Sequence, residues 1–229
     1  MAPCRPPGGA ALKALVLLSG GLDSAVCLWW ARGEGWDLLP LTVDYHERPA
    51  AEVRAVRDLL QAANVGHLVQ VPLPFLKEVS DLKQDGLPNA LLAGAPDAYI
   101  PARNMIFYSL AGYYAETLHA SLIVGGHNGI DPETFPDSSP DFFTHMNSLY
   151  RLGLWSYRKS QVSIKLPLAG KPKEEVLSMG RKLRVPYELT WSCYFDGPTH
   201  CGRCPSCLER RAAFRNLGLV DPVAYADGS

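Results

Sequence analysis

Patterns of buried strands and amphipathic helices alternate along the chain of 229 residues, and few architectures accept such an order. Short apolar runs typical of strands are followed by helix-length segments with one apolar face. Strands are predicted at residues 12–18, 38–45, 67–71, 121–125 and 162–167. Helices are predicted at residues 24–32, 50–63, 104–119, 141–152 and 172–184, the last with proline at its first position. The alternation predicts an α/β fold, a parallel sheet with helices on both faces, in which ligands bind beyond the carboxyl ends of the strands.

Charge and composition exclude several classes of protein. Lys and Arg number 22 against 23 Asp and Glu, and a net charge of −1 gives no general attraction to nucleic acid or to an anionic membrane. The chain is 47% hydrophobic, which is typical of a folded globular protein. Its most apolar stretch, residues 14–30, is interrupted by a polar, glycine-rich turn, so it fits neither a membrane span nor a signal peptide. We expect a cytoplasmic protein without membrane or nucleic-acid partners.

The turn after the first strand reads Ser19-Gly20-Gly21-Leu22-Asp23-Ser24 and opens a helix. Paired glycines let an anion approach the main chain, whose amides and helix dipole then bind phosphate, and the two serines add hydroxyl donors. An acid beside a phosphate suggests Mg²⁺ between them, which makes Asp23 the candidate metal ligand. The alternative is an ordinary turn with Ser24 as helix N-cap. The string SGGxDS resembles the pyrophosphate loop of ATP pyrophosphatases and is neither a Walker A loop nor a dinucleotide fingerprint, so we expect ATP binding.

Four of the six cysteines, Cys193, Cys201, Cys204 and Cys207, fall in the last fifth of the chain. Two consecutive CxxC steps bring three thiolates together, and Cys193 can fold back to complete a closed site of the structural Zn²⁺ type. An iron–sulfur cluster uses the same ligands, and free thiols in a mobile tail are the alternative without metal. Nearby, His200 is either a spare ligand or, as we expect, solvated, and Trp191 packs under the cysteine loop.

The chain divides into three predicted parts. Residues 1–10 are rich in Pro and Gly and form a mobile arm that carries Cys4. Residues 11–185 form the ATP-binding α/β domain, with Cys27 buried in its first helix, and residues 186–229 form a zinc-binding segment packed on it. Two Pro-rich loops stand out, at 72–101 and 131–140, and a loop as long as the first usually serves as a lid or a binding loop.

Further strings lie at the expected ligand edge and in the tail: VDY (43–45), IPARN (100–104), GHNGID (126–131), FPD (135–137), PL (167–168), KEEV (173–176), TWSCY (190–194) and CGRCPSC (201–207). Together with SGGLDS, they resemble the 7-cyano-7-deazaguanine synthases of the queuosine pathway, over residues 15–221. The resemblance implies a Rossmann-like fold of the adenine nucleotide α-hydrolase type, one structural zinc per subunit and a homodimer. It also implies an ATP-dependent ligase that converts 7-carboxy-7-deazaguanine and ammonia to the nitrile through acyl-adenylate and amide intermediates.

Site residues follow from the resemblance by position. Asp23, Ser24 and Lys173 are expected to be catalytic. The residues expected to bind ATP and Mg²⁺ are Leu18, Ser19, Gly20, Gly21, Leu22, Asp23, Ser24 and Lys173. The residues expected on the substrate side are Tyr45, Arg103, Asn104, Asp131 and Asp137.

Each assignment has a purely structural alternative. Lys173 could be a solvated helix residue, and Arg103 could pair with a surface carboxylate. Asp131 and Asp137 could cap their turn, while Tyr45 could belong to the core.

The chain departs from the family at two places. The family commonly reads DYGQRH where this chain has His46, Glu47 and Pro49, and PDCRPEF where this chain has Ser138 and Ser139. Loss of the arginine at 139 removes a bidentate anion donor. The alternatives are therefore a related amide ligase or adenylating enzyme for another carboxylate, and a non-catalytic nucleotide-binding zinc protein. A tRNA thiolase is a less favoured alternative, because it would need a basic surface that binds RNA. A non-catalytic nucleotide sensor would have no need of a Mg²⁺-organising acid such as Asp23.

Overall fold

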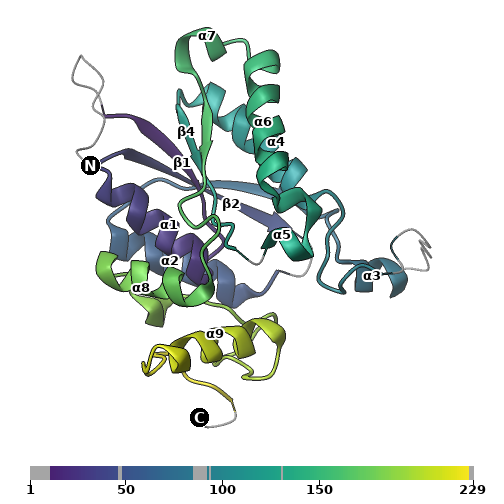
Figure 1. Ribbon diagram of the computed structural model, residues 1–229, viewed down its shortest axis with the longest axis vertical. Coiled ribbons are helices and arrows are strands. Elements are labelled where there is room, and N and C mark those ends of the chain that lie inside the picture. The colour runs from purple at the N-terminus through teal and green to yellow at the C-terminus, as the bar shows by residue number, and fades with distance from the viewer. Residues whose placement is uncertain (1–10, 46–47, 85–91, 93, 130, 227–229) are drawn as a thin grey trace.

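The computed structural model describes residues 11–45, 48–84, 92, 94–129 and 131–226. In this part of the chain, five parallel strands form one sheet in the order β3-β2-β1-β4-β5 (Figure 1). The strands are β1 Lys13–Leu17, β2 Asp37–Tyr45, β3 Val69–Leu73, β4 Leu122–Val124 and β5 Ser163–Lys165. The predicted parallel α/β sheet is confirmed. The predicted arm 1–10 with Cys4, and the departures at His46 and Glu47, lie outside the described residues.

Helices connect and flank these strands. They are α1 Leu22–Gly33, α2 Ala50–Ala63, α3 Val79–Gln84, α4 Arg103–Thr117, α5 Asp131–Thr134, α6 Pro140–Gly153, α7 Tyr157–Ser160, α8 Lys173–Leu183 and α9 Pro205–Asn216. Two short 3₁₀ turns, η2 Pro136–Ser138 and η3 Tyr187–Leu189, complete them. All five predicted helices are present. Pro172, predicted to be the first residue of its helix, is instead the N-cap of α8.

The two Pro-rich loops are more structured than predicted. The 72–101 segment contains α3, which projects from the body of the molecule (Figure 1), and the 131–140 segment contains α5 and η2. Helices of three to six residues have too little length to display an apolar period, so sequence periodicity does not reveal them.

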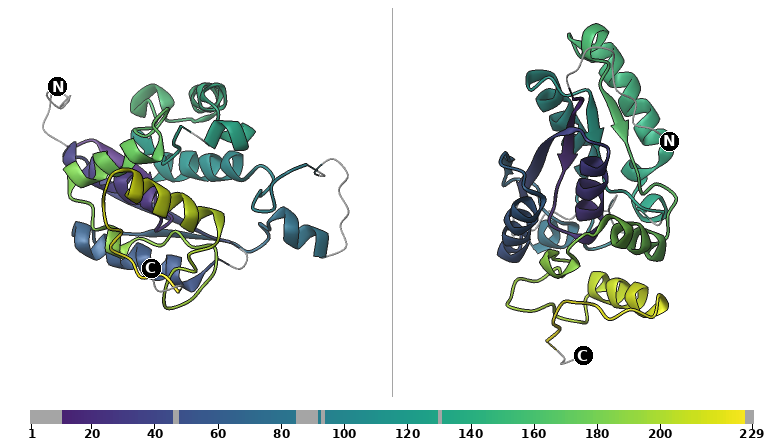
Figure 2. Two further views of the ribbon diagram at one scale, coloured as in Figure 1. Left: turned by 60° about the horizontal axis from the view of Figure 1, so that its bottom comes forward. Right: turned by 90° about the vertical axis from the view of Figure 1, so that its left-hand side faces the viewer.

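Two hydrophobic cores lie on opposite faces of the sheet. Successive β1 side chains alternate between them, with Ala14 and Val16 in one core and Leu15 in the other. Helices α1, α2 and α8 cover the first face, whereas α4 and α6 cover the second (Figure 2). The buried strands are therefore apolar on both faces, as a doubly covered parallel sheet requires. Cys27 is fully buried in α1, as predicted.

The C-terminal segment lies against α8 and holds α9, at the lower end of the molecule in Figure 1. Its anchor is Arg210, whose side chain is 1% exposed and makes two hydrogen bonds to the Asp221 carboxylate, at 2.8 and 2.9 Å. The same guanidinium donates to the Tyr187 carbonyl at 3.1 Å and to Thr190 Oγ1 at 2.7 Å. A buried arginine with these partners fixes the approach to the cysteine cluster.

In the described part of the chain, every helix is too short or too polar to cross a membrane.

Candidate functional site

The glycine-rich loop between β1 and α1 has a backbone that requires glycine at position 20. Gly20 has φ of +91°, and a Cβ there would lie 2.6 Å from the Glu52 carbonyl oxygen. Helix α1 begins at Leu22 with Gly21 as N-cap, so the alternative interpretation of Ser24 as N-cap is wrong. The loop therefore presents amides at the positive end of a helix of 12 residues, as an anion site does.

Two serines hold the loop in shape. Ser24 Oγ donates to the Gly21 carbonyl at 2.9 Å and accepts from the Ser19 amide at 3.2 Å. Ser19 Oγ donates to Ser24 Oγ at 3.1 Å and accepts from the Gly21 amide at 3.2 Å. The loop is thus held in shape by its own hydrogen bonds, and a loop ordered in this way loses less entropy on binding a ligand.

Asp23 and Lys173 meet above this loop, although 150 positions separate them in sequence. Lys173 Nζ lies 2.8 Å from Asp23 Oδ2 and 3.4 Å from Glu209 Oε2, and the lysine side chain is 12% exposed. Burial alone would lower the lysine pKa, but the two carboxylates outweigh it and raise the pKa. Lys173 is therefore a largely buried cation, and the alternative of a solvated helix residue is wrong.

Asp23 Oδ1 is buried and has no hydrogen-bond partner, whereas Oδ2 also accepts from the Asn128 side-chain amide at 3.3 Å. Asp131 accepts from the Asn128 amide at 2.8 Å, and burial raises its pKa. An unpartnered carboxylate oxygen beside a second acid is the oxygen-rich donor set that Mg²⁺ prefers. The residues present fit a divalent cation held by Asp23, with Asp131 close by.

Arg48 supports the glycine-rich loop, although the sequence analysis did not single it out. Its side chain is 2% exposed beneath the loop, where it donates to the Ser19 carbonyl at 2.5 Å and to the Val43 carbonyl at 2.8 Å. The Glu52 carboxylate balances this charge, with Oε2 2.8 Å from Arg48 Nε. Burial raises the pKa of Glu52, although Arg48 acts to lower it. The arginine thus ties the loop to the end of β2. The signal in the sequence was an Arg–Glu pair four residues apart at the start of α2.

The predicted substrate residues lie at the same edge but have structural partners. The Asp137 carboxylate accepts from the Asn104 amide at 2.9 Å and from its side chain at 3.3 Å, and so caps α4. The Arg103 guanidinium lies over the Phe135 ring at 5.6 Å. Asp131, as noted above, binds the backbone of its own turn. The structure brings these four residues together at this edge of the sheet.

Tyr45 packs into the second core, with its ring 6.4 Å from that of Phe107. Burial raises its pKa to about 12. Ser139, where the family has arginine, is the N-cap of α6, and its Oγ accepts from the Phe142 amide at 3.2 Å. This departure therefore has a local role in starting a helix.

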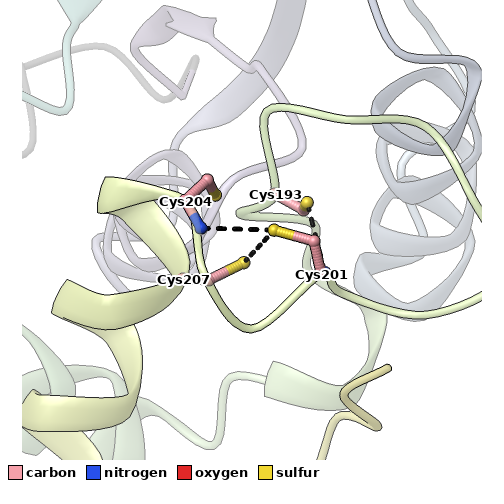
Figure 3. A group of neighbouring side chains, drawn as sticks. All are labelled: Cys193, Cys201, Cys204 and Cys207. Carbon is pink, nitrogen blue, oxygen red and sulfur yellow. Dashed lines mark hydrogen bonds between the residues drawn. The ribbon is translucent and has the colours of Figure 1, made fainter. Parts of the chain in front are cut away.

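The four predicted cysteines form one cluster (Figure 3). Their sulfur atoms all lie within 4.8 Å of one another, and the Cys201 and Cys207 sulfurs are 3.9 Å apart. A tetrahedral zinc with Zn–S bonds of about 2.3 Å places its sulfurs roughly 3.8 Å apart. The cluster therefore fits a structural metal ion, and the alternative of thiols spread along a mobile tail does not fit.

His200 lies beside the cluster but is 2% exposed, so the expectation of a solvated histidine is wrong. Its Nε2 accepts from the Ser192 amide at 3.1 Å, and its ring packs on Trp191 with centroids 4.3 Å apart. Trp191 packs under the cysteine loop, as predicted.

The C-terminal segment that carries the four cysteines (the cysteine segment, residues 186–229) also contacts the glycine-rich loop directly. The Trp191 amide donates to the Gly20 carbonyl at 2.9 Å. Asp196 Oδ1 accepts from the Ala51 amide at 2.9 Å at the start of α2. Since Glu209 of α9 lies near Lys173, the segment reaches the site at three points.

Comparison with known proteins identifies the family and the fold of the chain. A family model described as queuosine biosynthesis protein QueC matches residues 13–218. The 7-cyano-7-deazaguanine synthase of Thermosynechococcus vestitus is 40% identical over 223 residues, which cover 93% of this chain and 96% of that protein. The synthase of Picrophilus torridus is 36% identical over 221 residues, covering 94% and 92%. Among solved structures, NMN synthetase from Francisella tularensis shares the fold, with a TM-score of 0.54, 15% identity, and coverage of 96% of this chain and 81% of that chain.

Proposed function

The chain belongs to the QueC family of queuosine biosynthesis proteins, and from this premise we propose that it is the ATP-dependent ligase that makes 7-cyano-7-deazaguanine. The substrates are 7-carboxy-7-deazaguanine, ammonia and ATP. The observation that carries the proposal is the pairing of Asp23 and Lys173 over the phosphate loop, 2.8 Å apart, in a chain 36–40% identical to synthases of that name.

The chemistry needs two activations, because a carboxylate has no leaving group. Attack of the carboxylate oxygen on the ATP α-phosphate gives an acyl adenylate and releases pyrophosphate, and ammonia then displaces AMP to form the amide. A second adenylation, on the amide oxygen, lets the amide lose two protons and AMP to give the nitrile. Both steps depend on positioning and on charge stabilisation more than on a protein nucleophile.

We assign the protein's part as follows. Amides of residues 18–24 and the Lys173 ammonium hold the phosphates, and Ser24 orients the loop. Asp23, with Asp131 nearby, would hold Mg²⁺, which neutralises phosphate charge during transfer. Tyr45, Arg103, Asn104 and Asp137 would shape the substrate side.

Cys193, Cys201, Cys204 and Cys207 would hold one Zn²⁺ per subunit, and we retain the division into residues 11–185 and 186–229. A closed set of four thiolates leaves no position for water, which supports a structural ion. Thiolates require a reducing compartment, which supports the cytoplasm.

Two further proposals concern partners. A net charge of −1 supports small-molecule partners and not nucleic acid. Leu149 and Leu152 at the end of α6, with Trp155 just beyond, are exposed, Trp155 to 97%, and form an apolar surface suited to a second copy of the chain in a homodimer.

The test incubates the purified protein with ATP, Mg²⁺, ammonium and 7-carboxy-7-deazaguanine, and follows AMP by chromatography and the product by mass spectrometry. We expect the nitrile mass, with about two AMP per nitrile from the two adenylations. AMP formation that is absent, or unchanged by the carboxylate, contradicts the proposal. An amide that accumulates without nitrile identifies the related amide ligase.

A further inference from the structure

A cavity of about 250 Å³ lies between α6 and the carboxyl ends of β4 and β5, and no residue predicted for the substrate lines it. Its walls include His127, Asn128, Ser138, Phe143, Asn147 and Leu166. This edge of the sheet, beside the point where strand order reverses between β1 and β4, is where α/β proteins bind their ligands. The volume lies just below the range of drug-sized pockets, about 300–1,000 Å³, and so suits a small bicyclic molecule.

The lining mixes polar and apolar side chains, and the described residues that form it include no Asp, Glu, Lys or Arg. Its one ionisable ring, His127, stays neutral near pH 7, because burial and the charge of Arg103 lower its pKa to about 4. Phe143, Ile164 and Leu166 supply apolar surface. A phosphate or a carboxylate would find no counter-charge in this cavity, whereas an uncharged aromatic heterocycle would pack against its apolar side chains.

The polar groups are oriented by their other bonds. Ser138 Oγ donates to the Phe135 carbonyl at 2.6 Å, and Thr144 Oγ1 donates to the Pro140 carbonyl at 3.0 Å. Since each hydroxyl hydrogen is used, both oxygens meet a ligand as acceptors. Asn147 Oδ1 accepts from the Ile164 amide at 2.9 Å, which leaves its NH₂ group as the donor. Two acceptors and a donor complement a ring edge with N–H groups beside a carbonyl, the pattern of a guanine-like base.

The cavity is linked to the phosphate loop by Asn128. This residue lines the cavity, and its side-chain amide donates to Asp23 Oδ2 at 3.3 Å. A base in the cavity is thus separated from the Mg²⁺-binding acid by a single side chain. Ser138, one of the two departures from the family string, lies in the cavity wall.

We propose that this cavity binds the deazapurine base of the carboxylate substrate, with the carboxylate on the Asn128 side, facing the phosphate loop. The proposal rests on the function proposed above and adds the location of the base, between α6 and β5. It also assigns Ser138, Thr144 and Asn147 to recognition of the base edge.

Two adjacent residues of α6 provide a matched test. Thr144 and His145 are both exposed, but Thr144 lines the cavity and His145 does not. Thr144→Phe fills the cavity, Thr144→Val keeps the shape and removes the acceptor, and His145→Phe is the control. The dissociation constant of 7-carboxy-7-deazaguanine is measured by calorimetry with a non-hydrolysable ATP analogue present, and that of the analogue is measured alone.

We expect Thr144→Phe to weaken binding of the base more than tenfold, and Thr144→Val to weaken it by about three- to tenfold, the value of one hydrogen bond. His145→Phe should bind like the wild type, and binding of the ATP analogue should be unchanged in all three variants. Wild-type affinity for the base in both Thr144 variants, in a protein that makes the nitrile, overturns the location. If Thr144→Phe does not fold, the affinity of Thr144→Val for 7-carboxy-7-deazaguanine is the deciding measurement. A wild-type protein that forms no AMP with this substrate refutes the proposed function instead.

Discussion

The two carboxylate oxygens of Asp23 have different surroundings. Oδ2 accepts from Lys173 and Asn128, whereas Oδ1 is buried without a partner. A buried carboxylate oxygen without a hydrogen bond lowers the stability of the folded protein, by about 1–3 kcal/mol. Proteins tolerate such an atom at sites where a bound ligand satisfies it. This arrangement supports the proposed role of Asp23 as a cation ligand, with Lys173 balancing its charge.

Replacing Lys173 by methionine tests this arrangement. Lys173→Met keeps most of the length of the side chain but removes the cation that faces Asp23. We therefore expect kcat/KM for ATP to fall by about 10²–10³-fold, as when one stabiliser of transition-state charge is lost. Lys182→Met, an exposed position on the same helix, is the control and should keep wild-type activity. Equal activities of the two variants would contradict a phosphate role for Lys173.

His127 gives the fold a dependence on pH. Burial lowers its pKa from 6.5 to about 4, and Arg103 contributes in the same direction. The unfolded chain therefore binds more protons than the folded one between pH 6.5 and 4. The contribution of neutral His127 to the free energy of unfolding is complete above pH 6.5. It is lost as the pH falls towards 4, and the loss is at most roughly 3 kcal/mol.

Urea unfolding at pH 7.5 and at pH 4.5 measures this dependence. The loss of unfolding free energy on acidification should be smaller in His127→Asn than in the wild type. His67→Asn, at an exposed histidine, should lose as much as the wild type. His200, whose pKa burial also lowers to about 4, and Asp131, 3.8 Å from His127, remain in both variants, so the comparison isolates His127. Parallel losses in all three proteins would show that another group is responsible.

At single residues, sequence reasoning succeeded where a motif sets the geometry. The phosphate loop and the four cysteines are local strings whose spacing nearly determines their arrangement. His200 was misjudged because its burial depends on distant backbone, since its amide donates to the Ala224 carbonyl at 3.0 Å. Arg48 was missed for a related reason, because it donates a hydrogen bond to the carbonyl of Ser19, 29 positions away in the sequence.

Among the elements, the strand-turn-helix of β1 and α1 depends most on a single residue type. Gly20 and Gly35 both have positive φ, +91° and +74°, but only Gly20 has neighbours close to where a Cβ would lie. Alanine at either position costs about 1–2 kcal/mol for the left-handed backbone. Only at position 20 does the contact with the Glu52 carbonyl add a steric cost and displace the loop.

We therefore expect Gly35→Ala to lower the midpoint of thermal unfolding slightly and to bind ATP normally. Gly20→Ala should be destabilised further and lose measurable ATP affinity. Differential scanning fluorimetry with and without ATP and Mg²⁺ gives both quantities, because a bound ligand raises the midpoint. An ATP-induced rise in Gly20→Ala as large as in Gly35→Ala would show that the loop tolerates a side chain.

Helices were predictable where an apolar stripe meets the sheet. Helix α2 has the predicted bounds because Ala55, Val56 and Leu59 recur at the helical period and are buried. Helix α9 escaped prediction because one of its buried positions is Arg210, which breaks the apolar period. That position is satisfied by Asp221, eleven residues on, and no local pattern reveals such a partner.

At the scale of the whole molecule, the cysteine segment contacts and supports the proposed nucleotide site. The Trp191 amide donates to the Gly20 carbonyl, and the Asp196 carboxylate caps the start of α2. Glu209 lies beside Lys173. Trp191 is two residues from Cys193, so the position of its amide depends on whether the cluster is closed. We therefore expect a structural metal in the cluster to affect ATP affinity without touching the nucleotide.

Metal removal tests this route. Treatment with a zinc-selective chelator, followed by saturating Mg²⁺, should loosen residues 191–207 and release the Gly20 carbonyl, while the two cores of the sheet remain folded. The loss of one buried hydrogen bond, about 1 kcal/mol, predicts at least about a fivefold weaker Kd for ATP. Hydrogen exchange should show faster amide exchange at residues 20–23 as well as in the segment itself.

Asp196→Ala separates this effect from general destabilisation. It removes the cap on Ala51, which costs about 1 kcal/mol, but leaves all four thiolates and the Trp191 amide in place. We expect this variant to be less stable and yet to bind ATP within about twofold of the wild type, whereas Cys204→Ser should reproduce the chelated protein. ATP affinity that survives chelation, together with unchanged exchange at residues 20–23, would mean that the metal stabilises the segment alone. If Asp196→Ala lost affinity as Cys204→Ser does, stability in general, and not the bond from Trp191 to Gly20, would connect the cluster to the nucleotide.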